Sequence, residues 1–460
     1  MLKAFQTMYN DDQVRFKSVE QFEATKDALE RKSDLLIILP TGGGKTLTYL
    51  LPIFMEETLT TVIVLPYVVL VDQVEELCMS MNITSQIWRG KGHSIGNSQA
   101  ILIAAEHAVQ PEFQSLLITL QSTNKLARVV MDECHTAATH KDFREDIRRI
   151  GVLGRGGLRV PIHLLSATCT PEMARKLEII FGCLKLKTIR RIEDRKEIKY
   201  SVHNVDKEVK EMKDLYVKIG LFIVDEMEHW KEDDRAIIYC LQKEWANEMC
   251  EYFNKDMGHT WCKVYHAKMS HNERQEVLMA WKTGKVKIII ATSALGAGLD
   301  YRSVRLVIHH GFAQRLIDFC QESGRGGRDG KRAESVTFYW SEIEEKTKWI
   351  KEEGRKEMLE YCKSGMCRKL FMSLYLHGEG KDCLSQSEGL LCDNCERQLE
   401  TEQEWIPRLP VGQKRKRDEE MTEVEDVIAM KEMIKALQNK CPLCWIRQKE
   451  SCNHLFDDCE

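Results

Sequence analysis

Leu35-Leu-Ile-Ile-Leu-Pro-Thr-Gly-Gly-Gly-Lys-Thr46 is the stretch of sequence that decides the fold. Its first half is a short apolar run, typical of a strand buried on both faces of a parallel sheet. Its second half is a glycine-rich turn whose backbone N–H groups can surround phosphate oxygens. Lys45 can reach the β- and γ-phosphates of a nucleotide, and the Thr46 hydroxyl can bind Mg²⁺. The strict P-loop pattern requires Gly at the position of Leu39. The strand–turn–helix context nevertheless favours phosphate binding over a glycine-rich turn that binds nothing.

Similar apolar runs recur along the chain and alternate with helical stretches. Helix starts are predicted at Thr170, which precedes a proline, and at Ser270, which opens a capping box. This alternation predicts two doubly wound α/β units with parallel sheets, joined between Arg190 and Asp233, where apolar residues recur at helical spacing. The predicted strands are 35–39, 61–65, 100–104, 128–132, 163–167, 236–239, 263–265, 287–291, 306–309 and 336–339.

An acidic pair, Asp132 and Glu133, follows the fourth of these runs. A carboxylate at the end of a strand can hold Mg²⁺ beside the phosphate loop, and a second one can orient and deprotonate an attacking water. An acidic pair in this place is often only a helix cap. The phosphate loop upstream favours the nucleotide-site interpretation.

A second glycine-rich stretch, 321–330, carries Arg325 and Arg328. Two arginines three positions apart on such a turn suit bidentate contact with a phosphate, although a solvated basic loop is the alternative. An arginine finger contributes about 10³–10⁵ in rate. Its place in the second unit would make hydrolysis depend on the two units closing.

These motifs, in this order, resemble those of superfamily 2 helicases of the RecQ type. The resemblance covers roughly residues 14–395. The stretches that carry it are 16–21, 39–46, 64–73, 103–106, 132–135, 166–168, 237–239, 265–267, 291–300 and 321–328.

The resemblance implies roles for individual residues. Lys45, Asp132, Glu133, Arg325 and Arg328 are the expected catalytic residues, with Thr46 and Asp132 holding Mg²⁺. Residues expected to bind the nucleotide are Phe16, Lys17, Gln21 (the adenine-reading amide), Thr41, Gly42, Gly43, Gly44, Lys45, Thr46, Gly298, Asp300 and Gln321. Residues expected to contact DNA or couple it to hydrolysis are Glu106, His135, Phe143, Arg144, Ser166, Thr168 and Thr292.

Nine of the 17 cysteines fall in the last part of the chain, in two clusters. Four thiolates that include one C-x₂-C pair suit a tetrahedral structural Zn²⁺, and their order resembles the RecQ zinc module. The ligands expected there are Cys367, Cys383, Cys392 and Cys395, with Cys362 as the substitute for Cys383. The second cluster predicts a site like a stretched zinc knuckle at Cys441, Cys444, His454 and Cys459, with Cys452 as a possible replacement. Incidental cysteines are the alternative in both places.

The domain organisation follows from these motifs. Two tandem RecA-like α/β domains are expected at 1–195 and 196–345, followed by a small helical zinc-binding module at 346–400. A charged linker and amphipathic helix (401–440) then lead into the cysteine-bearing tail (441–460). Residues 414–417 resemble a nuclear import signal.

Composition excludes several classes of protein. The chain of 460 residues has 67 Lys and Arg against 71 Asp and Glu, a formal net charge of −4, which argues against a uniformly basic nucleic-acid coat protein. Neither a membrane-spanning run nor a signal peptide is recognisable, so a soluble intracellular protein is expected.

Two features depart from the RecQ pattern. The tryptophan of the loop after Asp132–His135 is missing, and we do not expect the family's winged-helix and terminal helical domains in the residues after Cys395.

The sequence therefore predicts an ATP-dependent 3′–5′ DNA helicase that uses ATP, Mg²⁺ and Zn²⁺. Its expected partners are single-stranded and tailed or branched double-stranded DNA, with no membrane. A nucleic-acid-stimulated ATPase without efficient unwinding, or one that prefers RNA, is the first alternative. A non-catalytic zinc-binding nucleic-acid adaptor is the second.

Overall fold

A computed structural model of the chain describes residues 1–40, 42–90, 97–108, 110–139, 159–183, 186–192, 195–256, 261–295, 301–348, 350, 354–386 and 388–405. The chain divides into two compact units, 1–399 and 400–460, and both β-sheets lie in the first. Among the described residues, no helix has the length and apolar character needed to cross a membrane.

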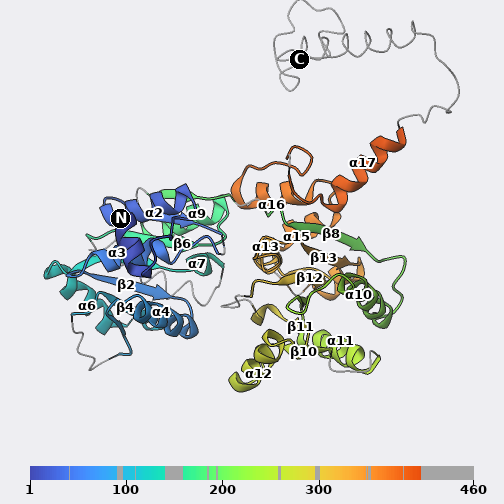
Figure 1. The fold of residues 1–460 in the computed structure, drawn as a ribbon, viewed down its shortest axis with the longest axis horizontal. Helices are drawn as coiled ribbons and strands as arrows, with labels where there is room; N and C mark the ends of the chain where they lie inside the picture. Colours follow the sequence, from blue (N-terminus) through green and yellow to red (C-terminus); the bar gives the residue numbers. More distant parts are fainter. Residues whose placement is uncertain are drawn as a thin grey trace, which may run out of the picture. The chain divides into compact units, whose positions relative to one another are not determined.

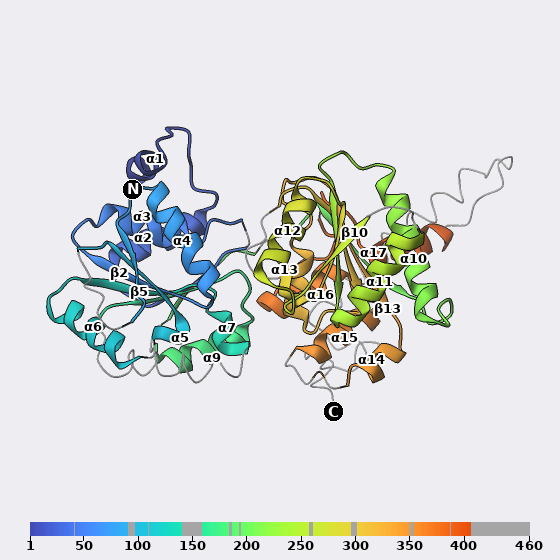
Figure 2. The same ribbon diagram turned by 90° about the horizontal axis from the view of Figure 1, so that it is seen from below.

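The first sheet has seven strands in the order β3-β4-β2-β5-β6-β1-β7, all parallel (Figure 1). Side chains of β1 alternate between two apolar cores, because Leu35 and Ile37 face one side of the sheet and Leu36 and Ile38 the other. Figure 2 shows α2, α3 and α4 on one face and α5, α6 and α9 on the opposite face. The strands are β1 (Leu35–Ile38), β2 (Thr60–Leu65), β3 (Ser85–Ile87), β4 (Ala100–Ala104), β5 (Leu126–Met131), β6 (Ile162–Ser166) and β7 (Lys187–Arg190).

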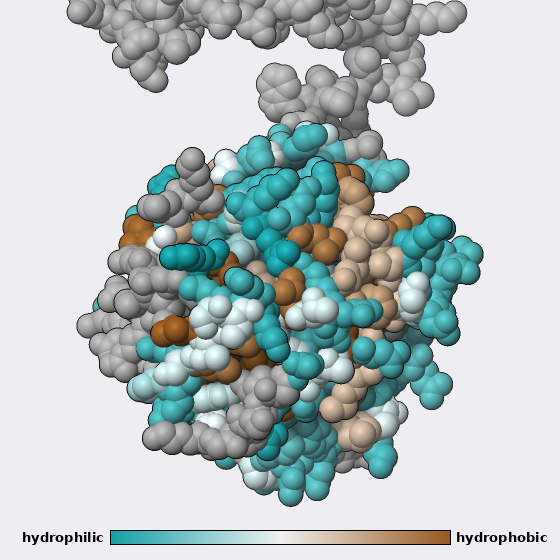
Figure 3. Space-filling model, turned by 90° about the vertical axis from the view of Figure 1, so that its left-hand side faces the viewer, coloured by the Kyte–Doolittle hydropathy of each residue, from teal (hydrophilic) through white to brown (hydrophobic). Residues whose placement is uncertain are grey.

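The helices of this first α/β unit are α1 (Leu2–Tyr9), α2 (Val19–Glu30), α3 (Leu47–Met55), α4 (Val68–Ser80), α5 (Ala105–Ala108), α6 (Pro111–Ser122), α7 (His135–Thr139) and α9 (Pro171–Phe181). Their outer surface is mostly hydrophilic, with separate apolar patches (Figure 3). The predicted cap at Thr170 is confirmed, because its side chain accepts a hydrogen bond from the Met173 N–H at 3.1 Å.

The second sheet has six parallel strands in the order β10-β11-β9-β12-β13-β8. They are β8 (Ile198–Asn204), β9 (Arg235–Cys240), β10 (Cys262–Tyr265), β11 (Ile288–Ala291), β12 (Val304–His310) and β13 (Ala333–Tyr339). Its helices are α10 (Met212–Met227), α11 (Lys243–Asp256), α12 (His271–Lys282), α13 (Leu316–Ser323) and α14 (Glu342–Lys346). The predicted capping box at Ser270 is present, with Glu273 as its partner.

All ten predicted strands are present, and the predicted fold class is confirmed. The strands that the sequence did not reveal are β3, β7 and β8, and each lies at an edge of its sheet. Edge strands are partly exposed and carry polar residues, so they lack the continuous apolar run on which the prediction relied. The first sheet ends at Arg190 and the second begins at Ile198, within the interval expected for the join.

Three helices follow the second sheet: α15 (Arg355–Lys363), α16 (Arg368–His377) and α17 (Asp393–Trp405). The four cysteines expected to bind zinc lie in the same apolar core as β8 and β13. The Val202 N–H, on the free edge of β8, donates to Asp393 Oδ2 at 3.1 Å, and the Leu390 N–H donates to the Lys196 carbonyl at 2.9 Å. The cysteine-bearing segment is therefore an extension of the second α/β unit.

Candidate functional site: a nucleotide-binding loop linked to the second sheet

The phosphate-binding loop connects β1 to α3. Gly42 and Gly44 have φ values of +81° and +79°, in the left-handed region that favours glycine. A Cβ atom on Gly43 would lie 2.9 Å from the Pro40 carbonyl oxygen, so the tight turn also excludes larger residues there. Thr46 is the N-cap of α3, which brings Lys45 and Thr46 to the positive end of this helix. Thr41 lies outside the described residues.

The upstream segment that contains Gln21 is anchored on this loop. The Gln21 side chain is 2% exposed; its Nε2 donates to the Gly44 carbonyl at 3.0 Å, and its Oε1 accepts from the Lys17 N–H at 2.6 Å. Lys17 Nζ also donates to the Gly42 carbonyl at 2.8 Å, while Phe16 packs on Phe5. A side-chain amide has two N–H groups and two lone pairs, so these two contacts use half of the hydrogen bonds that Gln21 can form.

The acidic pair stands at the end of β5, facing Lys45. Glu133 Oε1 lies 3.8 Å from Lys45 Nζ, and Glu133 Oε2 lies 3.2 Å from His135 Nδ1. Asp132 Oδ2 accepts a hydrogen bond from the Tyr49 hydroxyl at 3.3 Å. Glu133 has a φ of +49°, a left-handed conformation that costs a non-glycine residue about 1 kcal/mol or more. Strain of this kind is typical of functional sites.

The environment shifts the pKa values of the two carboxyl groups in opposite directions. Burial and the adjacent charge of Glu133 raise the pKa of Asp132 to about 6, against the opposing effect of Lys45. Burial acts to raise the pKa of Glu133 too, but Lys45 and His135 outweigh it and lower the pKa to about 2. Glu133 is therefore an ionised partner of Lys45, whereas the charged form of Asp132 is disfavoured.

A polar chain leads from the acidic pair to the second sheet. His135 Nδ1 lies 3.0 Å from Ser166 Oγ, at the end of β6. From α13 of the second α/β unit, Gln321 Nε2 donates to Thr168 Oγ1 at 2.6 Å and lies 3.5 Å from His135 Nε2. Gln321, expected as a nucleotide-binding residue, therefore contacts two of the seven residues expected to couple DNA binding to hydrolysis or to contact DNA.

Arg325 and Arg328 follow α13 on the glycine-rich turn. Arg325 is 6% exposed and lies near Tyr239, where its charge opposes the rise in the pKa of Tyr239 that burial causes. Tyr239 stacks on His309 with ring centroids 5.5 Å apart, and His309 Nε2 lies 2.9 Å from Glu322 Oε2. A buried polar cluster therefore fixes the base of the arginine turn.

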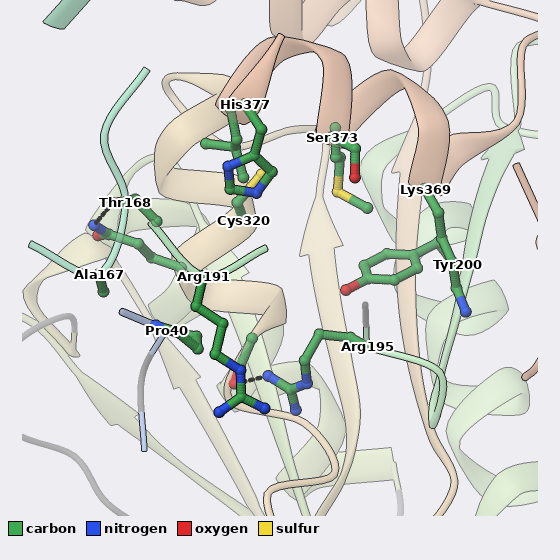
Figure 4. Close-up of a pocket in the computed structure, with 14 residues that line it drawn as sticks. Pro40, Ala167, Thr168, Arg191, Arg195, Tyr200, Cys320, Lys369, Ser373 and His377 are labelled. Atoms are coloured by element: carbon green, nitrogen blue, oxygen red, sulfur yellow. Dashed lines mark hydrogen bonds between the residues drawn. The ribbon is translucent and has the colours of Figure 1, made fainter. Parts of the chain in front are cut away.

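Arg195 holds the same turn from the connector between the sheets (Figure 4), and no sequence pattern singles it out. Its Nη1 donates to the Gly324 carbonyl at 2.9 Å, and its Nη2 donates to the Gly326 carbonyl at 2.5 Å. Glu197 accepts from its Nε at 2.5 Å. The only hint in the sequence is the concentration of basic residues just after the last strand of the first sheet.

Two other expected DNA-contact residues lie elsewhere. Glu106 is exposed on α5 and pairs with His107 at 3.5 Å, and Thr292 follows β11 with its N–H on the Tyr265 carbonyl at 3.2 Å. Within the described part of the chain, neither forms a hydrogen bond or ion pair with the nucleotide-site residues. The predicted residues Phe143, Arg144, Gly298 and Asp300 lie outside the described ranges.

The thiols of Cys367, Cys383, Cys392 and Cys395 form one buried cluster, with all sulfur atoms within 4.8 Å of one another. The Cys367–Cys383 and Cys367–Cys392 sulfur separations are 3.4 and 3.9 Å. Tetrahedral Zn²⁺ with Zn–S bonds of about 2.3 Å requires sulfur atoms about 3.8 Å apart, so the cluster fits zinc. Cys362, the possible substitute, is not among the four. Cys441, Cys444, His454 and Cys459 lie outside the described residues, as do residues 414–417.

Comparison with known proteins identifies the class. Residues 18–177 match the DEAD/DEAH box helicase family, and residues 218–330 match the helicase conserved C-terminal domain. Among solved structures, Dbp5 of Saccharomyces cerevisiae bound to RNA has a TM-score of 0.56 at 17% identity, covering 87% of this chain and 96% of that one. The helicase MrfA bound to DNA has a TM-score of 0.60 at 14% identity, covering 78% and 52%. The fold and the two matched regions are those of a two-domain helicase.

Curated relatives define the family more narrowly. The ATP-dependent DNA helicase hus2/rqh1 of Schizosaccharomyces pombe is 32% identical over 82% of this chain and 29% of its own length. The helicase Q-like 2 of Arabidopsis thaliana is 27% identical, covering 84% and 56%, and SGS1 of S. cerevisiae is 28% identical, covering 82% and 27%. These relatives are DNA helicases of the RecQ family, and this chain is similar to them over more than four fifths of its length. It spans between about a quarter and three fifths of the length of these relatives.

We predict that Asp132→Asn stabilises the nucleotide-free protein. The pKa of Asp132 is raised from 3.8 to about 6, so its charge destabilises the folded state above that pH and is absent well below it. In EDTA, the thermal unfolding midpoint of the variant should exceed that of the wild type at pH 7.5, and the gap should close as the pH falls toward 4. Asp214→Asn is the matched control: backbone N–H groups of Glu211 and Lys210 lower the pKa of Asp214, so this variant should not be stabilised. A lower midpoint for Asp132→Asn at pH 7.5 would contradict the prediction.

We also predict that Arg195→Ala lowers the turnover number for ATP while leaving the KM little changed. The loss of both carbonyl contacts frees the turn that carries Arg325, and misplacement of such a group by about 1 Å can cost about a hundredfold in rate. Steady-state ATPase measurements check this. Lys196→Ala, at a neighbouring exposed residue, should retain wild-type turnover. Equal turnover in both variants would show that Arg195 has no positioning role.

Proposed function

We propose that this chain is an ATP-dependent DNA helicase that translocates 3′ to 5′ along single-stranded DNA and separates tailed or branched duplexes. The observation that carries the proposal is the polar chain from Lys45 through Glu133 and His135 to Gln321, because it joins a nucleotide-binding loop to the second sheet. The curated relatives named above are DNA helicases, which supports DNA as the substrate.

Nucleotide binding would rearrange the acidic pair. The phosphates of ATP compete with Glu133 for Lys45, and once Lys45 turns to them the Glu133 carboxylate is released to orient and deprotonate the attacking water. Thr46 and Asp132 would hold Mg²⁺, which neutralises phosphate charge. The raised pKa of Asp132 marks a carboxylate that gains from a cation.

The second unit would complete the site. Arg325 and Arg328 would stabilise charge on the transferred phosphoryl group when the two α/β units close, with Arg195 and the His309–Glu322 pair holding the turn in place. Gln321, Thr168 and His135 transmit the state of the nucleotide between the sheets. Separating DNA costs a mean of about 1.4 kcal/mol per base-pair step in stacking, so directed unwinding needs this coupling.

We further propose that the thiols of Cys367, Cys383, Cys392 and Cys395 bind one structural Zn²⁺, supported by their sulfur separations. The Arg368 N–H donates to Cys392 Sγ at 3.3 Å and the Cys383 N–H to Cys367 Sγ at 3.3 Å, which suits thiolate ligands. The second zinc site at the tail and a nuclear location directed by residues 414–417 remain predictions from the sequence.

We expect Lys45→Ala to lower DNA-stimulated ATPase activity by at least about a hundredfold, because it removes the cation that contacts the phosphates. Zinc content should be unchanged. Strand displacement on 3′-tailed DNA, 5′-tailed DNA and tailed RNA duplexes then tests the substrate and the polarity. Unwinding of the 3′-tailed DNA alone, lost in Lys45→Ala, is the expected result.

Other outcomes of this experiment point to other functions. DNA-stimulated phosphate release without strand displacement would identify a translocating ATPase, and preference for the RNA duplex would overturn the choice of DNA. Full ATPase activity in Lys45→Ala would refute the nucleotide site. If the wild type shows no ATPase activity, the result would favour the alternative of a non-catalytic nucleic-acid adaptor.

We expect Cys383→Ser to bind one zinc equivalent fewer than the wild type and to unfold at a lower temperature. Structural zinc contributes on the order of 10 kcal/mol to local folding, and this cluster shares the core of the second α/β unit. Metal analysis and thermal unfolding are the measurements. Cys362→Ala is the matched control, since it alters a buried cysteine outside the cluster and should keep the full zinc content. Equal zinc content in both variants would show that Cys383 is not a ligand.

A further inference from the structure

Tyr49 lies between the two residues that we propose as Mg²⁺ ligands. It is in the first turn of α3, three positions after Thr46, and its backbone N–H donates to the Thr46 carbonyl at 3.3 Å. Its side chain is 1% exposed, and its ring belongs to the apolar core on one face of the first sheet. A side chain enclosed to this degree acts through its neighbours rather than by touching a ligand.

The Tyr49 hydroxyl is the polar end of this buried side chain, and it reaches the acidic pair that follows β5. It donates to Asp132 Oδ2 at 3.3 Å. Burial and the charge of Asp132 raise the pKa of Tyr49 well above its usual value, whereas a hydrogen bond with the Thr46 side chain acts in the opposite direction. One hydroxyl group therefore interacts with the side chains of both proposed Mg²⁺ ligands.

Two hydrogen bonds fix the orientation of the Asp132 carboxylate. The Glu133 N–H donates to Asp132 Oδ1 at 2.9 Å, and Tyr49 holds Oδ2. Within the described part of the chain, no other side chain forms a hydrogen bond with Asp132. A carboxylate oxygen has two lone pairs, so each oxygen keeps one that can bind a cation.

Mg²⁺ is a cation for which this orientation matters. It binds oxygen ligands at about 2.0–2.1 Å in near-ideal octahedral geometry, so a displaced ligand binds poorly. Thr46 begins α3 and Asp132 follows β5, two elements that are far apart in the sequence. A hydroxyl and a carboxylate, together with phosphate oxygens, are a suitable set of ligands for this ion. Outer groups that orient metal ligands typically contribute about 10–100-fold to metal affinity.

We propose that Tyr49 is a positioning residue for Mg²⁺, because its hydroxyl fixes the Asp132 carboxylate relative to Thr46. This inference rests on the proposed nucleotide site and names the residue that sets the metal affinity of that site. The phosphate-binding loop itself is anchored by Gln21 and Lys17, through the carbonyls of Gly44 and Gly42. Loss of the Tyr49 hydroxyl should therefore weaken metal binding and leave metal-free nucleotide binding intact.

The test compares Tyr49→Phe with the wild type. Phenylalanine keeps the ring in the core and removes only the hydroxyl. Mn²⁺ serves as the spectroscopic probe, and the free ion is measured by electron paramagnetic resonance with the protein in excess over ADP. The affinity of the ADP complex for Mn²⁺ should fall about tenfold in Tyr49→Phe. The affinity for ADP in EDTA, measured by titration calorimetry, should not change.

Tyr216→Phe is the matched control. The Tyr216 side chain is 3% exposed, and its hydroxyl donates to Glu248 Oε2, also at 3.3 Å, but it lies in the second α/β unit. This variant loses the same kind of hydrogen bond and should keep the Mn²⁺ affinity of the wild type. Both variants should unfold at similar temperatures in EDTA, so a loss of metal binding is separated from a loss of stability.

The outcomes distinguish this inference from the proposed function on which it rests. Undiminished Mn²⁺ affinity in Tyr49→Phe would overturn the inference and leave the nucleotide site in place. An equal loss in Tyr216→Phe, or weaker ADP binding by Tyr49→Phe in EDTA, would also overturn it, because the effect would not be specific to the metal. If the wild-type ADP complex binds Mn²⁺ no better than ADP alone, the proposed nucleotide site fails and the inference fails with it.

Discussion

The contact of Gln321 with Thr168 and His135 is the interaction on which the organisation of this protein depends. Each sheet packs mainly on its own apolar cores, with Ile317 of α13 joining a core of the first sheet. Polar groups at strand ends add a second link between the sheets. The Gln321 amide donates to Thr168 and lies 3.5 Å from His135. Thr168 in turn contacts Ser166, and His135 contacts both Ser166 and Glu133. Because amide hydrogen bonds are short-ranged, a small change in either partner alters the link.

The acidic pair beside the nucleotide-binding loop destabilises the fold. Asp132 and Glu133 are adjacent like charges at the end of a buried strand, and Glu133 also has a left-handed backbone conformation. Lys45 compensates one carboxylate and leaves the other with a raised pKa. The charged form of Asp132 is therefore unfavourable at this strand end, and a cation beside it would stabilise that form.

Much of this could be predicted from the sequence, and the exceptions have a physical explanation. Buried central strands are recognisable because their side chains are apolar on both faces, whereas β8 alternates and was missed. The loop around Lys45, the acidic pair and the arginine turn are local patterns, so spacing alone revealed them. Arg195 acts through contacts with residues far away in the chain, Gly324 among them, and no local pattern records such contacts. Cys383 was the least certain zinc ligand because its spacing is unusual, yet its sulfur lies in the cluster.

The way the cysteine-bearing segment covers β8 has a consequence for solubility. β8 is the outermost strand of its sheet, and Asp393 and Leu390 occupy backbone groups that would otherwise face outward. An uncovered strand edge is a template for pairing with a second molecule. Loss of the zinc that we propose for the four cysteines would therefore uncover this edge and favour association of two chains through it.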